Sequence, residues 1–299
     1  MNLRLLVPIS AVAVILAWWF WPPQPPLCGE SLLCTASPQQ ATEILEWRKE
    51  SVSMPAIILG IADDISGSSK DNGIKPLTIN HLKPAIDRIE RTGGEIALAT
   101  ISDLPEESLI RLRVLPRPIL PSTLQEVPDK YLQKLKKSAD KVCDEVPWTE
   151  RDACRKTLES NRKELLTVMT AYKQQFAQWK DETKTAIGEF TPEAEKRLSR
   201  KRGGNSDVCT PLNRLALFLQ EPRLWLNESP VMQALVLNTD GEETVRPGCG
   251  LPELPRAADV TVANGGGKTG ALSVYKPKRF DSFDAALDAV IRKKVSTLR

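Results

Sequence analysis

One apolar run of the chain ends abruptly in carboxylate and hydroxyl groups: Ala56-Ile57-Ile58-Leu59-Gly60-Ile61-Ala62-Asp63-Asp64-Ile65-Ser66-Gly67-Ser68-Ser69. An apolar stretch bounded by Gly and Ser is typical of a strand buried on both faces of a parallel sheet. The spacing of Asp64, Ser66 and Ser68 allows a tight loop to turn one carboxylate and two hydroxyls toward a common point. Such oxygen ligands suit Mg²⁺, Mn²⁺ or Ca²⁺ rather than zinc.

A second apolar run ends in the same way. It comprises Ala234-Leu235-Val236-Leu237-Asn238-Thr239-Asp240-Gly241-Glu242 and again places a carboxylate and a glycine after a strand-like stretch. Asp, Ser and Gly also form ordinary turns at strand ends, so either loop alone is weak evidence for a metal site. Two acid-terminated strands in one chain favour a shared site, because ligands of open α/β sheets gather beyond the carboxyl ends of the strands.

These residues resemble the von Willebrand factor type A domain, the fold of integrin inserted domains. Its metal-ion-dependent adhesion site (MIDAS) uses D-x-S-x-S after the first strand, a Thr on a second loop and an Asp in a T-D-G or S-D-G turn after a later strand. The resemblance covers about residues 52–117 and 203–298. It implies a doubly wound α/β domain, 52–117 and 203–299, whose mostly parallel sheet has one antiparallel edge strand.

The second loop departs from the family pattern. Family members carry Gly-Gly-Thr or a similar Thr before a helix, whereas this chain has Gly203-Gly204-Asn205-Ser206-Asp207-Val208-Cys209-Thr210-Pro211-Leu212. Counting back from Leu212, the first apolar helix position, places Ser206 at the position of the Thr. Thr210 is the other candidate, and it is also a suitable N-cap because Pro211 is favoured at the first helical position.

The resemblance also implies roles for these residues. Asp64, Ser66 and Ser68 would hold Mg²⁺ (or Mn²⁺ or Ca²⁺) directly or through water. Ser206 or Thr210 would complete the shell, and Asp240 would act largely through water. One coordination position would remain for an acidic side chain of a protein partner.

The N-terminal segment predicts a membrane anchor. Residues 5–21 are 17 consecutive uncharged residues, preceded by Arg4 and closed by Trp18-Trp19-Phe20-Trp21 and two prolines. We interpret residues 1–23 as a transmembrane helix. A cleaved signal peptide is the alternative, but no small-x-small cleavage site follows the apolar core. Arg4 on the short side indicates a cytoplasmic N-terminus and an extracytoplasmic, periplasmic main domain.

Six cysteines suit that oxidising location: Cys28, Cys34, Cys143, Cys154, Cys209 and Cys249. Sequence alone does not fix their connectivity, but pairing them in chain order closes three local loops. In that scheme the bridge between Cys209 and Cys249 ties the second metal loop to the loop that leaves the third. The alternative is free thiols in a cytosolic protein. The lone histidine, His81, and the lack of C-x-x-C argue against structural zinc.

Between the anchor and the first strand, residues 24–51 form a Pro-rich stalk with a short helix near 41–49. Residues 118–202 interrupt the family pattern as an α-helical hairpin insert. Its two helical stretches place Leu124, Tyr131, Leu135 and Val142, and then Leu158, Leu165, Tyr172, Phe176 and Trp179, on single faces. The basic run 196–202 ends the insert, and we expect it to be a solvated linker.

The remaining patterns predict elements around the metal loops. Apolar spacing indicates a helix over 78–92, stopped by Gly93-Gly94. Residues 95–102 and 108–115 predict a hairpin whose second strand alternates apolar residues with arginines, as a half-exposed edge strand does. Further predicted elements are a helix over 212–220, a strand over 259–263, a strand-like stretch over 271–275 and a closing helix over 280–295.

These observations favour a membrane-anchored, metal-dependent protein-binding module over an enzyme. The charges are nearly balanced, with 41 basic and 38 acidic residues, and give no case for nucleic acid. Two alternatives stay open: a structural envelope-assembly component with a degenerate metal site, and a metal-assisted hydrolase. The hydrolase lacks a base beside a nucleophile and a nucleophile-elbow motif.

Overall fold

The computed structural model describes residues 35–50, 55–103, 108–125, 143, 147–201, 203–226, 231–241, 250–263 and 270–292. The chain divides into two compact units, Met1–Val52 with Ile119–Lys173, and Ser53–Pro118 with Gln174–Arg299. Among the described residues, no helix combines the length and the apolar character needed to cross a membrane. The predicted anchor, the 126–142 part of the first insert helix, Cys28, Cys34 and Cys249 lie outside those residues.

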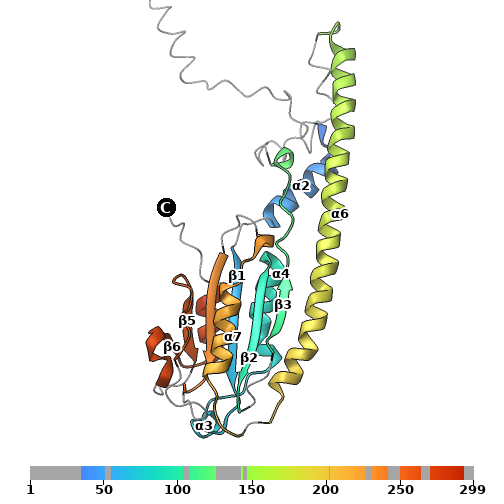
Figure 1. Cartoon of the computed structure of the whole chain (residues 1–299). Helices are drawn as coiled ribbons and strands as arrows, with labels where there is room; N and C mark the ends of the chain where they lie inside the picture. The colour runs from blue at the N-terminus through green and yellow to red at the C-terminus, as the bar shows by residue number, and fades with distance from the viewer. Residues whose placement is uncertain are drawn as a thin grey trace, which may run out of the picture. The chain divides into compact units, whose positions relative to one another are not determined.

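One six-stranded sheet organises the second unit, in the order β3-β2-β1-β4-β5-β6 (Figure 1). The strands are β1 Ala56–Asp64, β2 Gly94–Ile101, β3 Ile110–Val114, β4 Val231–Asn238, β5 Asp259–Ala263 and β6 Lys278–Phe280. Neighbours pair in parallel except β2 and β3, which are antiparallel. The predicted α/β class, the mostly parallel sheet and the antiparallel edge strand are therefore confirmed.

Burial explains why these segments are strands. Every residue of β1 and of β2 is buried, as expected for strands covered on both faces. In β3 buried apolar residues alternate with exposed Arg111 and Arg113, which is the period of a strand with one solvated face. β1 lies between β2 and β4, so its end is surrounded by the ends of both neighbours.

Helices cover both faces of the sheet, which makes the domain doubly wound. One core contains residues of α4 (Ile79–Thr92), α8 (Phe283–Ile291) and the last turns of α6 (Arg151–Leu198). The other contains residues of α7 (Cys209–Gln220). The bounds of α4 agree with the prediction, and Ser282 caps α8 by accepting a hydrogen bond from the Ala285 N–H at 3.2 Å.

Helix α6 (Arg151–Leu198) is the long helix in Figure 1 and extends into the segment that was predicted to be a linker. It runs through Leu198, so the first residues of the basic run 196–202 are helical rather than part of a linker. Its last turns bury Phe190, Ala194 and Leu198 in the core on one face of the sheet. The boundary between the two compact units falls inside this helix, at Lys173 and Gln174.

The segment over 271–275 is not a strand. It forms the 3₁₀-helix η5 (Gly270–Tyr275), and Leu272 is buried while Ser273 and Val274 are exposed. This is not the alternation of a strand. Lys276, with φ of 48°, then redirects the chain into β6, which the sequence did not predict.

In the first unit, α2 (Pro38–Glu50) packs against residues of α6. The rings of Trp47 and Tyr172 lie 4.9 Å apart between centroids. Arg48 donates through Nε to the Leu124 carbonyl at 2.9 Å, which holds the 3₁₀-helix η2 (Ser122–Leu124) on α2. Cys143 and Cys154 form a disulfide with Cα atoms 5.9 Å apart, which confirms this predicted pair.

Gly94 sets the contact between β1 and β2, and its replacement is the first test of the fold. Its φ is +136°, and an added Cβ would lie 2.2 Å from the backbone oxygen of Ile57, its partner in the register. Gly94→Ala should lower the free energy of unfolding by about 1–3 kcal/mol from backbone strain alone. Urea unfolding measures the effect. Gly188→Ala is the control, because a Cβ on Gly188 meets nothing within 4 Å; equal midpoints for the two variants would contradict this account.

Candidate metal centre

The predicted ligands lie at the end of the sheet where β1 and β4 finish. Asp64 is the last residue of β1, Ser66 is the N-cap of the short helix α3 (Gly67–Asp71), and Ser68 lies in that helix. Asp63 is in register with Asn238, the last residue of β4, and Asp240 follows two residues later. The structure therefore brings the first and third predicted loops together.

Asp64 is the centre of the contacts between these loops. Its Oδ1 accepts a hydrogen bond from the Ser66 N–H at 2.9 Å, and its Oδ2 accepts one from the Thr239 hydroxyl at 2.6 Å. The hydroxyl oxygens of Ser66 and Ser68 lie 3.1 Å apart. Residues 175 positions apart in the chain are thus joined directly beside Asp240. The result is a compact group of carboxylate and hydroxyl oxygens.

The Asp64 carboxyl group lies in an environment that disfavours its negative charge. Asp64 is fully buried. Its burial raises the pKa of the carboxyl group above the ordinary value of 3.8, and the nearby charge of Asp240 raises it further. Hydrogen bonds from Ser66 and Thr239 act in the opposite direction but do not outweigh burial. A cation held between the two carboxylates would relieve both the desolvation and the repulsion.

The second loop is attached to the first by backbone hydrogen bonds. The Gly67 N–H donates to the Gly204 carbonyl, and the Gly203 N–H donates to the Ile65 carbonyl, both at 3.0 Å. Asp207 forms an isolated antiparallel bridge with Ser102, just past β2. Ser206 lies within this attached segment and is buried. The structure therefore places Ser206 on a loop that contacts the Asp64 loop.

Thr210 is not the N-cap that the sequence predicted. Helix α7 begins at Cys209, so Thr210 lies in its first turn. The Asp207 carboxylate accepts hydrogen bonds from the Thr210 N–H at 3.0 Å and from its hydroxyl at 2.7 Å. An ionised Asp is a strong acceptor beside the positive end of a helix, which explains why it takes over the capping. The Thr210 hydroxyl is thus directed to Asp207.

Sequence reasoning missed three polar residues of this region. Thr239 lies in the second apolar run and donates to Asp64, a contact that the sequence pattern does not predict. Asn72 donates through its side-chain amide to Asp240 Oδ2 at 2.8 Å. Asn238 donates to Asp63 Oδ1 at 2.7 Å, so this neighbouring buried aspartate is hydrogen-bonded to the last residue of β4. The D-x-S-x-S spacing predicts a role for none of these three residues.

Cys209 is disulfide-bonded in the structure. Its predicted partner, Cys249, lies outside the described residues, so the bridge between the second and third loops stays a prediction. Cys209 itself is buried at the start of α7, three residues after Ser206.

Comparison with known proteins adds no assignment. No protein-family model, curated protein or solved structure matches the chain. In the ranges that the structure describes, no three His, Cys, Asp or Glu side chains form a cluster that could hold a metal by themselves. The candidate site between the loops contains only two carboxylates, those of Asp64 and Asp240, together with serine hydroxyls, so it falls outside this definition.

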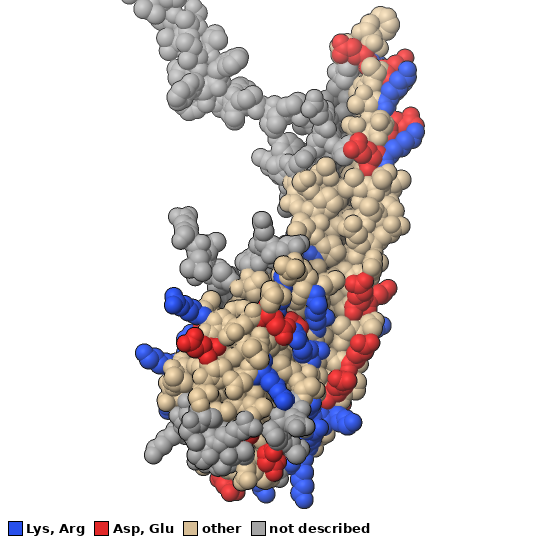
Figure 2. All heavy atoms as spheres, viewed as in Figure 1, with Lys and Arg blue, Asp and Glu red and all other residues tan. Residues whose placement is uncertain are grey.

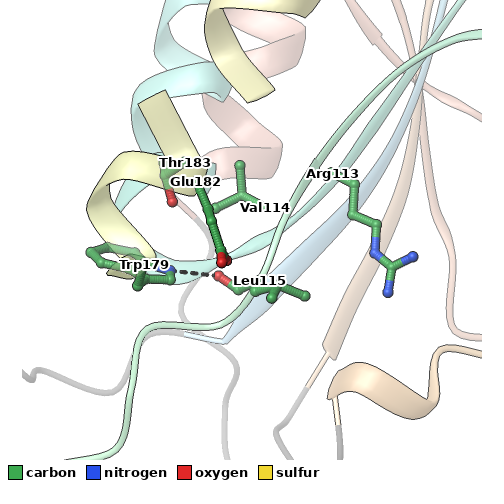
Figure 3. Close-up of a pocket in the computed structure, with 6 residues that line it drawn as sticks. All are labelled: Arg113, Val114, Leu115, Trp179, Glu182 and Thr183. Atoms are coloured by element: carbon green, nitrogen blue, oxygen red, sulfur yellow. Dashed lines mark hydrogen bonds between the residues drawn. The ribbon is translucent and has the colours of Figure 1, made fainter. Parts of the chain in front are cut away.

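A separate hollow lies between β3 and α6 (Figure 3). It is lined by Arg113, Val114, Leu115, Trp179, Glu182 and Thr183 and has a volume of about 170 Å³. The indole N–H of Trp179 donates to the Leu115 carbonyl at 2.9 Å across it. Small-molecule sites usually enclose about 300–1,000 Å³. The oxygen cluster is therefore the better candidate for function.

Proposed function

We propose that the chain is a membrane-anchored, metal-dependent protein-binding module of the von Willebrand factor type A kind, facing the periplasm. The observation that carries the proposal is the hydrogen bond between Thr239 and Asp64, which joins the two acid-terminated loops at the ends of the central strands. In this proposal the cation serves binding, and no covalent bond is made or broken.

The sheet supports this kind of domain over the other common fold with the same strand order. Dinucleotide-binding domains also use the order 3-2-1-4-5-6, but with parallel strands and a G-x-G-x-x-G turn after the first strand. Here β3 is antiparallel to β2. The turn after β1 is Ile65-Ser66-Gly67-Ser68-Ser69, which lacks that glycine pattern. The carboxylate and hydroxyl groups at the end of β1 are instead of the kind that can bind a cation.

The residues present fit a hard cation. Asp64, Ser66, Ser68 and Asp240 would hold it, with Ser206 on the attached second loop supplying the remaining hydroxyl. Mg²⁺ prefers such oxygen ligands and retains waters that a carboxylate can replace, and Mn²⁺ or Ca²⁺ suits the same ligands. The bound cation would supply a positive coordination position for an acidic side chain of a protein partner.

The surface is consistent with a protein partner. On the face of the sheet-containing unit seen in Figure 2, Lys and Arg side chains are interspersed with Asp and Glu side chains. The whole chain has a net charge of only +3. Recognition of nucleic acid depends on a strongly basic surface, whereas a bound metal can recognise a single carboxylate without one.

A structural role without metal is the second candidate. The observation that favours it is the second loop, where the Thr210 hydroxyl donates to Asp207 and Ser stands at the family's Thr position. In that case the buried Asp64 and Asp240 would serve only to join loops.

Metal titration distinguishes the two candidates. We expect Mg²⁺ at 100 times its Kd to stabilise the native state by about 2.7 kcal/mol. For a domain of this size that corresponds to a melting temperature about 5–10 °C higher, at about 2–4 °C per kcal/mol. Chelator should reverse the rise, and a pull-down from native membranes should lose its specific partner in chelator. A melting curve that millimolar Mg²⁺ and Mn²⁺ leave unchanged would favour the structural role.

A further inference from the structure

Asn72 connects the first loop to the third, although neither the sequence pattern nor the family resemblance assigns it a role. Its side-chain amide donates to Asp240 Oδ2 at 2.8 Å, across 168 residues of chain. Asp240 is buried, with 5% of its surface exposed. Asn72 therefore contacts a predicted ligand without being a predicted ligand itself.

The backbone of Asn72 is held by the hydrogen bonds that end α3. Asn72 is the C-cap of α3, and its N–H donates to the Ser68 carbonyl at 2.9 Å. Gly73, with φ of +74°, then ends the helix. At the other end of α3, the Ser66 hydroxyl accepts a hydrogen bond from the Ser69 N–H at 3.4 Å. One short helix thus presents Ser66 and Ser68 at its start and the Asn72 amide at its end.

We infer that Asn72 is a positioning residue that holds Asp240 by one oxygen and thereby makes the site favour Mg²⁺ over Ca²⁺. The inference rests on the proposed function. An oxygen that accepts from an amide is less available to a metal, so Asp240 offers a single oxygen or acts through water. Ca²⁺ frequently takes both oxygens of a carboxylate and six to eight ligands, whereas Mg²⁺ keeps octahedral geometry and several waters. A carboxylate limited in this way suits Mg²⁺.

The test is Asn72→Ala, with Kd values for Mg²⁺ and Ca²⁺ measured by titration of the full chain. Loss of an outer partner of a metal ligand typically weakens metal binding about 10- to 100-fold. We expect Mg²⁺ Kd to rise about 10-fold, and Ca²⁺ Kd to rise less, so that the preference for Mg²⁺ shrinks. Asn80→Ala, which removes the same side chain from an exposed position in α4, is the control and should leave both constants unchanged.

A second measurement needs no metal. The carboxyl carbon of Asp240 should change its NMR chemical shift in metal-free Asn72→Ala, and not in Asn80→Ala, because only the first loses the amide contact. A general loosening of α3 would weaken both metals equally and leave their ratio unchanged, which would overturn the inference. An unchanged Asp240 signal would also overturn it. If the parent protein binds neither metal, the proposed function fails, and this inference fails with it.

Discussion

Asp64→Asn is expected to abolish the whole Mg²⁺-dependent rise in melting temperature while leaving the metal-free protein at least as stable as the parent. Asp64 is buried, and its carboxyl pKa is raised by that burial and by the charge of Asp240. Asparagine has nearly the same shape, so it keeps an oxygen beside Ser66 but removes the buried charge. The variant separates the role of Asp64 as a ligand from its role in packing.

The pH dependence has a defined sign. Because the folded protein holds the Asp64 proton more tightly than the unfolded chain, this group destabilises the metal-free fold progressively as pH rises from about 3.8 through the raised pKa. Asp64→Asn should remove that decline. Thermal melts of metal-free protein between pH 4 and 8 measure it. If the decline persists in the variant, or Mg²⁺ still raises its melting temperature, Asp64 is not the central ligand.

Asp63→Asn is the matched control for this experiment. Asp63 is equally buried and adjacent in sequence, but its carboxylate accepts hydrogen bonds from the Asn238 amide and from the Leu77 N–H, at 2.7 and 3.4 Å. Its replacement should lower stability, because one of these donors loses its acceptor. It should leave the Mg²⁺ increment in place. Equal effects of the two substitutions on the metal response would argue against a site at Asp64.

The central strands and the helix α4 could be predicted because each has one local signal. β1 and β4 are apolar runs long enough to be strands buried on both faces, and Thr78 and Gly93 bound α4 at both ends. The type of element could not be predicted where the apolar run was short: in 271–275 the pattern around the buried Leu272 did not distinguish a strand from a 3₁₀-helix.

The closeness of the residues of the candidate site could be predicted, whereas the hydrogen bonds that link its loops could not. Asp64, Ser66 and Ser68 are close in sequence, and their spacing alone indicates a loop with oxygens on one side. The hydrogen bonds that link the first and third loops join residues far apart in the chain: Thr239 is 175 residues from Asp64, and Asn72 is 168 residues from Asp240. Whether such residues meet depends on which strands are neighbours and on their register, and a local sequence pattern specifies neither. The apolar stripe on α6 likewise predicts which face of the helix is buried but not which residues cover that face.

A buried ion network lies at the opposite end of β2 from the metal loops, and there we expect the largest loss of stability. Glu95 is the second residue of β2, and its side chain is 4% exposed. Its Oε1 accepts from Arg111 Nη2 at 2.7 Å, and its Oε2 accepts from Arg223 Nε at 2.9 Å. The guanidinium groups of Arg111 and Arg223 also lie 4.9 and 4.7 Å from the ring centroid of Phe218.

This network fixes α7 against the edge of the sheet. Arg223 donates to the carbonyl of Phe218, near the end of α7, at 2.6 Å, and to that of Glu221, just past it, at 2.7 Å. Cations near the C-terminus of a helix also complement its dipole. Glu95 supplies the charge that compensates Arg223, whose side chain is only 6% exposed. Removal of the carboxylate therefore leaves a guanidinium buried without its main counter-charge.

Glu95→Ala should therefore lower the free energy of unfolding by about 3–5 kcal/mol, the usual cost of breaking a buried ion pair by removing one partner. Glu221→Ala is the matched control. Glu221 also pairs with Arg111, through Oε2 and Nη2 at 2.5 Å, but its side chain is 43% exposed, so we expect a loss of at most about 1 kcal/mol. Urea unfolding of both variants gives the difference. If the two losses are equal, solvent reaches the Glu95 pair and the network does not hold α7 to the sheet.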